Sequence, residues 1–313
     1  METGKRKVGI IGAGAVGATY AFALLQSGLA REIILLDVNR ERAEGEAMDL
    51  RHGLPLALPA RIRAGDYPDI ADADLVVITA GVAQRPGESR LELVHRNAEI
   101  FKGICSELGS LNPEGILLIV TNPVDVMTEL TLRFTGLPSR RVIGSGTVLD
   151  SARFRYALGR TFQVDPRNVH AYVVGEHGDS EVLLWSLATI AGVPVEKYAA
   201  GRKSDFSPEA ITTEVKQAAY EVIQRKGATS AAVALAMLRI SEAILRDQNS
   251  ILCVSSHLED YLGLSDVCLS VPCVVNRQGV RERVQVAPSE DECRALAHSA
   301  GVLREMLDQV AAP

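Results

Sequence analysis

Three glycines near the start of the chain have the spacing of a phosphate-binding loop. Gly12, Gly14 and Gly17 stand in the run G-A-G-A-V-G, between the apolar run Val8–Ile11 and a helical pattern. In such a loop the glycines permit a tight turn, close approach of a pyrophosphate, and helix–strand packing. Asp37 ends the next apolar run, where its carboxylate could bind ribose hydroxyls. The combination predicts a dinucleotide site. A Gly-rich turn in an ordinary α/β unit would leave Asp37 unexplained.

His177 is the residue best suited to move a proton. It stands in the flexible run G-E-H-G-D-S, at 175–180. A nicotinamide exchanges a hydride with its substrate, so a second group must move the matching proton, and histidine titrates near neutral pH. The plainer alternative is a histidine in a surface turn.

Asp150 and Arg153 are three residues apart at the start of an expected helix, so they share one face. The carboxylate could hold an imidazole in one tautomer and stabilise its protonated form. The guanidinium could bind a substrate carboxylate through two hydrogen bonds. Alternatively, Asp150 caps the helix and forms a surface ion pair with Arg153. The residues alone leave both interpretations open.

Two further polar residues follow expected strands. Arg90 ends a polar loop with two glycines and a proline, from which it could stabilise a developing oxyanion. It could equally be a solvated loop arginine. Asn122 could hydrogen-bond the cofactor amide or the substrate, and the bond to Pro123 is a candidate for the cis form.

The elements that would position these residues change character near residue 145. Before it, short apolar runs alternate with helical stretches, which is typical of a parallel sheet covered by helices. The expected strands are 7–11, 33–37, 75–80 and 116–121.

After residue 145 the pattern becomes mixed, and a tight turn at 277–279 implies antiparallel strands. The expected elements are a helix at 150–163, an extended run at 169–175, a helical region at 208–247 broken near Gly227, strands at 250–256, 266–275 and 280–287, and a helix from Ser289. We therefore expect an α/β fold: a Rossmann-type parallel-sheet domain over 1–145, then a mixed α+β substrate domain over 146–313.

Composition excludes several classes of protein. The 313 residues carry a net charge of −6, which argues against nucleic acid as a partner. The first strand begins near Lys7, so we expect no signal peptide, and the longest apolar run, Ile116–Val120, is too short to span a membrane. The five cysteines form no C-x-x-C pair, so we expect reduced thiols, no metal site and a cytoplasmic location.

Taken together, the motifs resemble those of the lactate and malate dehydrogenases, from Lys7 to the C-terminal helix. The segments that carry the resemblance are G-A-G-A-V-G at 12–17, Asp37, R-P-G-E-S-R at 85–90, T-N-P-V-D-V at 121–126, G-S-G-T-V-L-D-S-A-R at 144–153 and G-E-H-G-D-S at 175–180.

The resemblance implies roles for these residues. His177 would be the proton donor and acceptor, Asp150 its partner, Arg153 the anchor of the substrate carboxylate, Arg90 a mobile arginine that polarises the carbonyl, and Asn122 a contact of substrate or cofactor. The cofactor would be NAD. Its site would comprise Gly12, Gly14, Ala15, Val16, Gly17, Asp37, Thr79, Ala80, Gly81 and Asn122.

Gln84 bears on the choice of substrate. Malate enzymes of the family carry an arginine at this position, whereas Gln84 offers no charge to a second carboxylate. Thr229 matches the small polar residue that lactate enzymes place against the substrate methyl. Pyruvate and L-lactate are therefore favoured, although the missing bulk at Ala231 could admit larger 2-oxo acids. The alternatives are a malate dehydrogenase and a non-catalytic NAD-binding sensor, which would be expected to lack His177, Asp150 or Arg153.

Arg155 lies about 200° around the helix from Arg153 and so faces away from the pocket. In bacterial lactate dehydrogenases, the positions matching Arg155 and His170 bind fructose 1,6-bisphosphate across a subunit interface. The resemblance thus implies an anion site on a twofold axis and a homotetramer. A solvated arginine and a packed strand histidine are the alternative.

Overall fold

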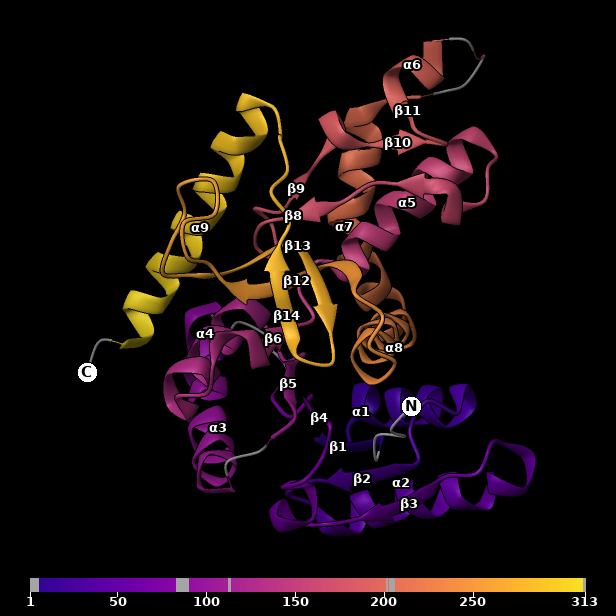
Figure 1. The fold of residues 1–313 in the computed structure, drawn as a ribbon, viewed down its shortest axis with the longest axis vertical. Helices are drawn as coiled ribbons and strands as arrows, with labels where there is room; N and C mark the ends of the chain where they lie inside the picture. The colour runs from indigo at the N-terminus through magenta and orange to yellow at the C-terminus, as the bar shows by residue number, and fades with distance from the viewer. Residues whose placement is uncertain (1–5, 83–89, 112–113, 201, 203–205, 312–313) are drawn as a thin grey trace.

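A nine-stranded sheet runs through the molecule in the computed structural model, which describes residues 6–82, 90–111, 114–200, 202 and 206–311 (Figure 1). Its strand order is β14-β13-β12-β6-β5-β4-β1-β2-β3. The strands are β1 (Lys7–Ile11), β2 (Glu32–Leu36), β3 (Arg61–Ala64), β4 (Leu75–Ile78), β5 (Ile116–Ile119), β6 (Val142–Gly144), β12 (Ser250–His257), β13 (Cys268–Asn276) and β14 (Gly279–Arg283).

Strands β1 to β6 are parallel and follow the Rossmann order. The central strands are unbroken runs of Val, Ile and Leu, because helices cover both faces of a parallel sheet. The strand order reverses between β1 and β4. Ligands of such sheets bind at this switch point, beyond the carboxyl ends of the strands.

The last three strands belong to the same sheet. Antiparallel β12 joins β6 where Ser255 lies opposite Gly144. A Cβ at Gly144 would lie 2.8 Å from the Cβ of Ser255, so only glycine permits this junction. The predicted fold class is confirmed, but the sequence pattern did not reveal that the antiparallel strands extend the parallel sheet. The strand expected at 280–287 is also shorter, ending at Arg283.

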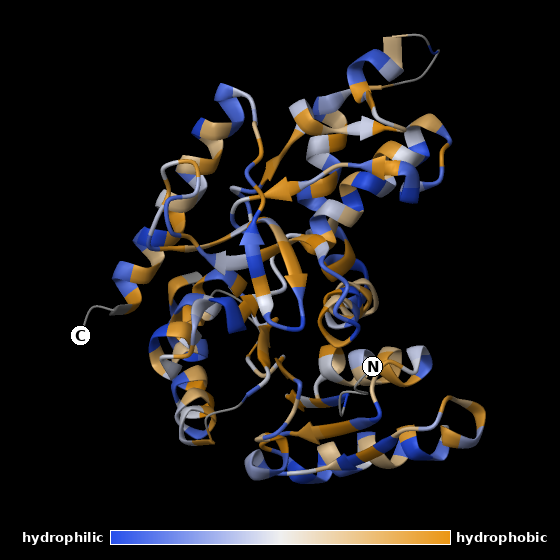
Figure 2. Ribbon diagram, in the orientation of Figure 1, coloured by the Kyte–Doolittle hydropathy of each residue, from blue (hydrophilic) through white to orange (hydrophobic). Residues whose placement is uncertain are grey.

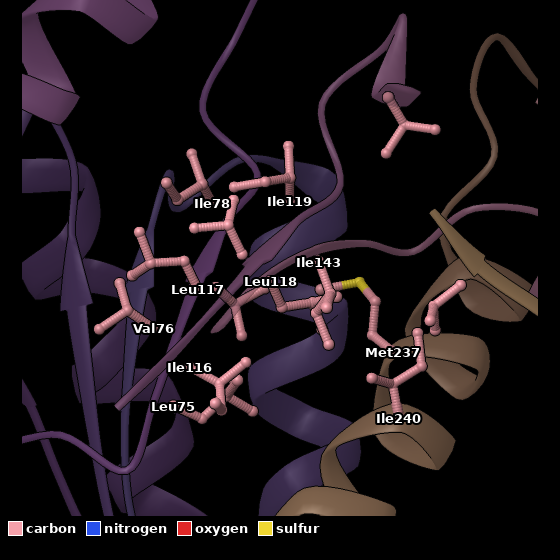
Figure 3. Close-up of a cluster of buried hydrophobic side chains, with 14 of the residues drawn as sticks. Leu75, Val76, Ile78, Ile116, Leu117, Leu118, Ile119, Ile143, Met237 and Ile240 are labelled. Atoms are coloured by element: carbon pink, nitrogen blue, oxygen red, sulfur yellow. The ribbon is translucent and has the colours of Figure 1, made fainter. Parts of the chain in front are cut away.

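Helices cover the sheet on two sides. On one side lie α1 (Ala15–Ser27), α2 (Arg40–His52) and α8 (Ala231–Leu245), and on the other α3 (Arg90–Leu111), α4 (Val124–Thr135) and α9 (Glu290–Ala311). Figure 3 shows Met237 and Ile240 of α8 packed beside Ile143 and the β4–β5 side chains. The hydroxyls of Tyr20 and Ser241 are 2.5 Å apart and link α1 to α8.

A smaller assembly follows β6 and has its own apolar core around Phe154, Phe162 and Trp185. Figure 2, in which the ribbon is coloured by hydropathy, shows apolar residues alternating with hydrophilic ones along its helices. Its elements are α5 (Val148–Phe162), β7 (Val169–His170), β8 (Val173–Val174), β9 (Val182–Leu183), β10 (Thr189–Ile190), β11 (Val193–Pro194), α6 (Val195–Ala200) and α7 (Pro208–Lys226), with short 3-10 helices at Pro166–Asn168 and Trp185–Leu187. Before β6, short 3-10 helices lie at Leu54–Leu56, Tyr67–Ile70 and Ser139–Arg141.

The expected break in the long helical region is confirmed. Helix α7 ends at Lys226, and Gly227 adopts a φ of 85°, which glycine allows at little cost. In the part of the chain that is described, every helix is too short or too polar to pass through a lipid bilayer.

Candidate active site

The glycine loop joins β1 to α1, and its three glycines meet different surroundings. Gly12 has a φ of 106°, and a Cβ there would lie 2.6 Å from the Ala80 nitrogen. A Cβ on Gly17 would lie 2.0 Å from the Gly12 carbonyl oxygen. A Cβ on Gly14 would meet no atom within 4 Å. Two glycines are thus required by the packing of the fold, whereas Gly14 borders open space.

Asp37 holds this loop against the end of β2. Its carboxylate accepts hydrogen bonds from the Ala13 nitrogen at 2.7 Å and the Asn39 nitrogen at 2.9 Å. Helix α1 starts with Ala15 and Val16 and carries no acidic side chain in its first turn. Its free N–H groups and the positive end of its dipole can therefore bind phosphate, and the surroundings of the loop fit a dinucleotide.

Thr79, Ala80 and Gly81 form the adjoining wall at the end of β4. The Thr79 hydroxyl donates to the Gly12 carbonyl at 2.8 Å, and the Thr121 hydroxyl donates to the Ala80 carbonyl at 2.7 Å. These bonds tie the ends of β1, β4 and β5 together at the switch point.

Asn97 is a buried residue that the sequence analysis missed. Its side-chain oxygen accepts from the Val82 nitrogen at 2.9 Å, and its amide donates to the Asn122 carbonyl at 2.9 Å. It thereby links the start of the loop after β4 to the Asn122–Pro123 segment, whose peptide bond is cis. A signal was present in the sequence: Asn97 interrupts the apolar face of α3 between Val94 and Phe101, all three buried.

Asp150, Arg153 and His177 meet at the start of α5. The Asp150 carboxylate lies 2.6 Å from Nδ1 of His177 and accepts a 2.7 Å hydrogen bond from Arg153. Asp150 is 2% exposed, so it forms a buried pair rather than the surface pair that the residues alone left open. With Nδ1 engaged by Asp150, Nε2 of His177 is the ring nitrogen left for a substrate.

Electrostatics keep the imidazole protonated at neutral pH. Burial disfavours the imidazolium, but the charge and hydrogen bond of Asp150 outweigh it and raise the pKa of His177 to about 9. Burial likewise disfavours the Asp150 carboxylate, but His177 and Arg153 outweigh it and lower the pKa of Asp150. His177 can therefore act as an acid at neutral pH.

A second carboxylate fixes the backbone of His177. Asp125, at the start of α4, accepts a 2.8 Å hydrogen bond from the His177 nitrogen, and the Ser270 hydroxyl lies 3.4 Å from its other oxygen. The Ser299 hydroxyl of α9 accepts from the neighbouring Glu176 nitrogen at 2.7 Å. The sequence pattern predicted none of these anchors. Asp125 stands in the T-N-P-V-D-V motif, and an acid within its apolar first turn was the available signal.

A cavity of about 100 Å³ opens beside His177. Its polar lining includes Asn122, Arg153, His177 and Thr229, and the rest is largely apolar, with Leu149, Ile223 and Val233 among the side chains. Four of the predicted site residues therefore converge on one small chamber. Gln84 and the side chain of Arg90 lie outside the described part of the chain. Ala231 is exposed and is not among the residues that line this chamber.

Comparison with known proteins identifies the family. Residues 6–144 match the model of the lactate/malate dehydrogenase NAD binding domain, and residues 147–313 match that of the α/β C-terminal domain. The chain belongs to the lactate/malate dehydrogenase family. Its cofactor is NAD. The open space beside Gly14, where a Cβ would meet no atom within 4 Å, fits the close approach of this cofactor.

Members of the lactate/malate dehydrogenase family resemble the chain over nearly its whole length. L-lactate dehydrogenase 1 of Clostridium acetobutylicum is 52% identical, covering 97% of this chain and 98% of that protein. L-lactate dehydrogenase of Acetivibrio thermocellus is also 52% identical, covering 96% of each. The ligand-bound crystal structure of the minor L-lactate dehydrogenase from Enterococcus mundtii superimposes with a TM-score of 0.95 at 41% identity, covering 99% of each chain.

Arg155 and His170 lie away from this chamber. Arg155 donates to the Pro166 carbonyl at 3.3 Å, while its Nε is buried without a hydrogen-bond partner. His170 is exposed on β7, an edge strand of a three-stranded sheet of β11, β10 and β7. An unpaired buried N–H group is costly, and an anion is one group that could satisfy it.

The different surroundings of the glycines give a testable contrast in this NAD-binding loop. Gly14→Ala should leave the free energy of unfolding within about 1 kcal/mol of wild type, because its φ of −72° suits alanine, yet weaken NADH binding at least about tenfold. Gly17→Ala should cost about 1–3 kcal/mol of stability through overpacking. Urea unfolding and NADH fluorescence titration measure the two effects.

Gly45→Ala is the matched control, since a Cβ there meets no atom within 4 Å and it lies in helix α2, outside the loop. It should bind NADH as wild type does. Wild-type NADH affinity in Gly14→Ala would show that the cofactor does not approach this glycine.

Proposed function

We propose that this protein is an NAD-dependent L-lactate dehydrogenase that interconverts pyruvate and L-lactate. The observation that carries the proposal is the buried Asp150–His177 pair, with Arg153, at the wall of a small, largely apolar chamber. NAD, when bound, supplies the hydride chemistry. The names of the C. acetobutylicum and A. thermocellus relatives support the same activity.

The residues of the chain have distinct tasks in this reaction. His177 donates a proton to the carbonyl oxygen of pyruvate and takes it back when lactate is oxidised. Arg153 uses one Nη to hold Asp150, which leaves its other N–H groups for the substrate carboxylate. Arg90 polarises the carbonyl, and Asn122 contacts the cofactor amide or the substrate.

The chamber favours a monocarboxylate. Thr229 and apolar side chains surround the space for the substrate methyl. A dicarboxylate such as oxaloacetate would bury a second charge that an uncharged Gln84 cannot pair, at a cost of several kcal/mol. We therefore assign pyruvate rather than oxaloacetate.

We also propose a cytoplasmic homotetramer. All five cysteines are free, as expected in a reducing compartment. A cavity of about 360 Å³ between α5 and α8 is bordered by Leu235 and Ile251, which are 63% and 47% exposed. Exposed apolar groups of this kind are typical of surfaces that another subunit covers.

Arg155 borders the same cavity, and we propose that Arg155 and His170 bind fructose 1,6-bisphosphate where two subunits meet. The unpaired Nε of Arg155 and the exposed imidazole of His170 supply donors for phosphate. A twofold axis would bring two copies of each residue to one anion.

Substrate choice tests the activity directly. Wild-type kcat/KM with NADH should be higher for pyruvate than for oxaloacetate, and Gln84→Arg should shift that ratio at least about tenfold toward oxaloacetate because it adds a countercharge.

His177→Gln should bind NADH normally but lose at least about a hundredfold in turnover. A wild-type preference for oxaloacetate would favour a malate dehydrogenase, and unchanged turnover in His177→Gln would remove His177 from the mechanism.

The pH profile tests the Asp150–His177 pair. Pyruvate reduction needs protonated His177, so its kcat/KM should fall as pH rises through about 9, and lactate oxidation should rise over the same range. In Asp150→Asn the carboxylate that raises the His177 pKa most is gone, while burial still lowers that pKa and Asp125 and Glu181 raise it by less. The fall should therefore move to lower pH, with a reduced maximum rate. Asp49→Asn, a change at an exposed residue of α2, is the control and should leave the pH profile unchanged. An unchanged pH profile in Asp150→Asn would show that Asp150 does not raise the pKa of the catalytic group.

Saturation with pyruvate tests the anion site. Fructose 1,6-bisphosphate should lower the KM for pyruvate, more strongly near pH 6 than near pH 8, because a protonated imidazole binds an anion more tightly. Arg155→Ala should abolish the response, whereas Arg160→Ala, on the same helix but paired with Glu214, should keep it. A response that survives in Arg155→Ala would place the effector elsewhere.

A further inference from the structure

Three potential metal ligands meet where α4 packs against β12 and β13, apart from the chamber beside His177. Glu129 lies one helical turn after Asp125 on α4. His257 ends β12 and Cys268 begins β13, and the two are directly opposite in the antiparallel register. Opposed residues of antiparallel strands project on the same side of the sheet, so both can reach Glu129.

The three side chains are already close enough to share an ion. One ligand atom from each lies within 4.8 Å of the others, and Nδ1 of His257 is 3.0 Å from Oε2 of Glu129. Ligands at about 2.1 Å from a tetrahedral ion lie roughly 3.4 Å apart. Small side-chain shifts would therefore bring all three into coordination.

We propose that Glu129, His257 and Cys268 form a binding site for a divalent transition-metal ion, Zn²⁺ by preference. A thiolate, an imidazole and a carboxylate are the ligands that zinc takes in proteins, and three of them leave a fourth position for water. Calcium and magnesium prefer sets made only of oxygen. The separated positions 129, 257 and 268 form no spacing motif, which is why the cysteine pattern pointed to no metal.

Charges around the group are compatible with an ion. Burial disfavours the Glu129 carboxylate, but hydrogen bonds from His257, Cys268 and Arg133 outweigh it and hold the pKa of Glu129 at about 2. Burial and the neighbouring Glu129 raise the pKa of the Cys268 thiol well above its usual range, so the entering ion displaces the thiol proton. The resulting thiolate and the carboxylate together balance a charge of +2.

Arg133 and Arg283 bring positive charge to the edge of the site, while the negative charges of Glu259 and Asp125 offset it. Arg133 donates to Oε1 of Glu129 at 2.9 Å, as an outer-shell partner that orients a ligand does, and the ion would replace the hydrogen bond between Oε2 and His257. Glu129 and Cys268 are 3% and 1% exposed, whereas the His257 side chain is 19% exposed. An ion would therefore enter from the side of His257.

Cobalt titration of the chelator-treated full-length protein tests the site. Co²⁺ should bind once per chain and give the sulfur-to-cobalt charge-transfer band and the visible bands of a tetrahedral site, and Zn²⁺ should abolish them. Cys268→Ala should lose the charge-transfer band and bind Co²⁺ at least about tenfold more weakly. Cys273→Ala is the matched control, because Cys273 is buried on the same strand outside the cluster, and it should keep both signals.

His257→Gln gives an independent check if Cys268→Ala does not fold, and it should also weaken Co²⁺ binding at least about tenfold. Circular dichroism and NADH binding establish that each variant is folded. The proposal would be overturned if the wild-type protein gave no charge-transfer band. It would also be overturned if the band persisted in Cys268→Ala, because the band would then come from another thiol, such as the partly exposed Cys293.

Discussion

The contact between Asp150 and His177 is the interaction on which the rest of the site depends. A buried carboxylate is costly unless it is paired and hydrogen-bonded, and Asp150 has both a histidine and an arginine within 2.7 Å. The pair requires the first turn of α5 and the loop after β8 to be held in register. Asp125 does so through the His177 nitrogen, and Ser270 pairs through its backbone with Gly175. Elements from both halves of the chain thus fix one proton-carrying ring.

The single sheet explains how these elements stay in place. Strand β6 pairs with β5 on one side and with β12 on the other, so the dinucleotide loop and the histidine loop rest on one rigid surface. The largely buried side chains of Asn97 and Thr121 join the neighbouring strand ends by hydrogen bonds. Such buried polar bonds are expensive to leave unmade, which makes the arrangement specific as well as stable.

The sequence predicted those features that depend on residues close together in the chain. These are the glycine loop, the strands of the parallel sheet and the break at Gly227, which follow from the backbone freedom of glycine and from apolar runs. The extension of the sheet by β12 could not be predicted, because it depends on Ser255 meeting Gly144 across more than a hundred residues. The roles of Asn97, Asp125 and Ser299 could not be predicted for the same reason. Each is a polar residue whose hydrogen-bond partner is distant in sequence and is brought close only by the fold. The proximity of Asp150 to His177 followed only from family resemblance.

The buried acids around His177 raise a final question of charge balance. Asp150, Asp125 and Glu181 are all at most 5% exposed, with His177, Arg153 and Lys216 as the cations beside them. Burial and the neighbouring Asp150 raise the pKa of Glu181 to about 8, which disfavours its ionised form. Burial also raises the pKa of Asp125, to about 6, although hydrogen bonds favour its ionised form. Asp150 is the acid whose pKa is lowered rather than raised, and it is the one in contact with the imidazole ring. The fold thus concentrates negative charge on the carboxylate that stabilises protonated His177, while burial weakens the charge of its neighbours.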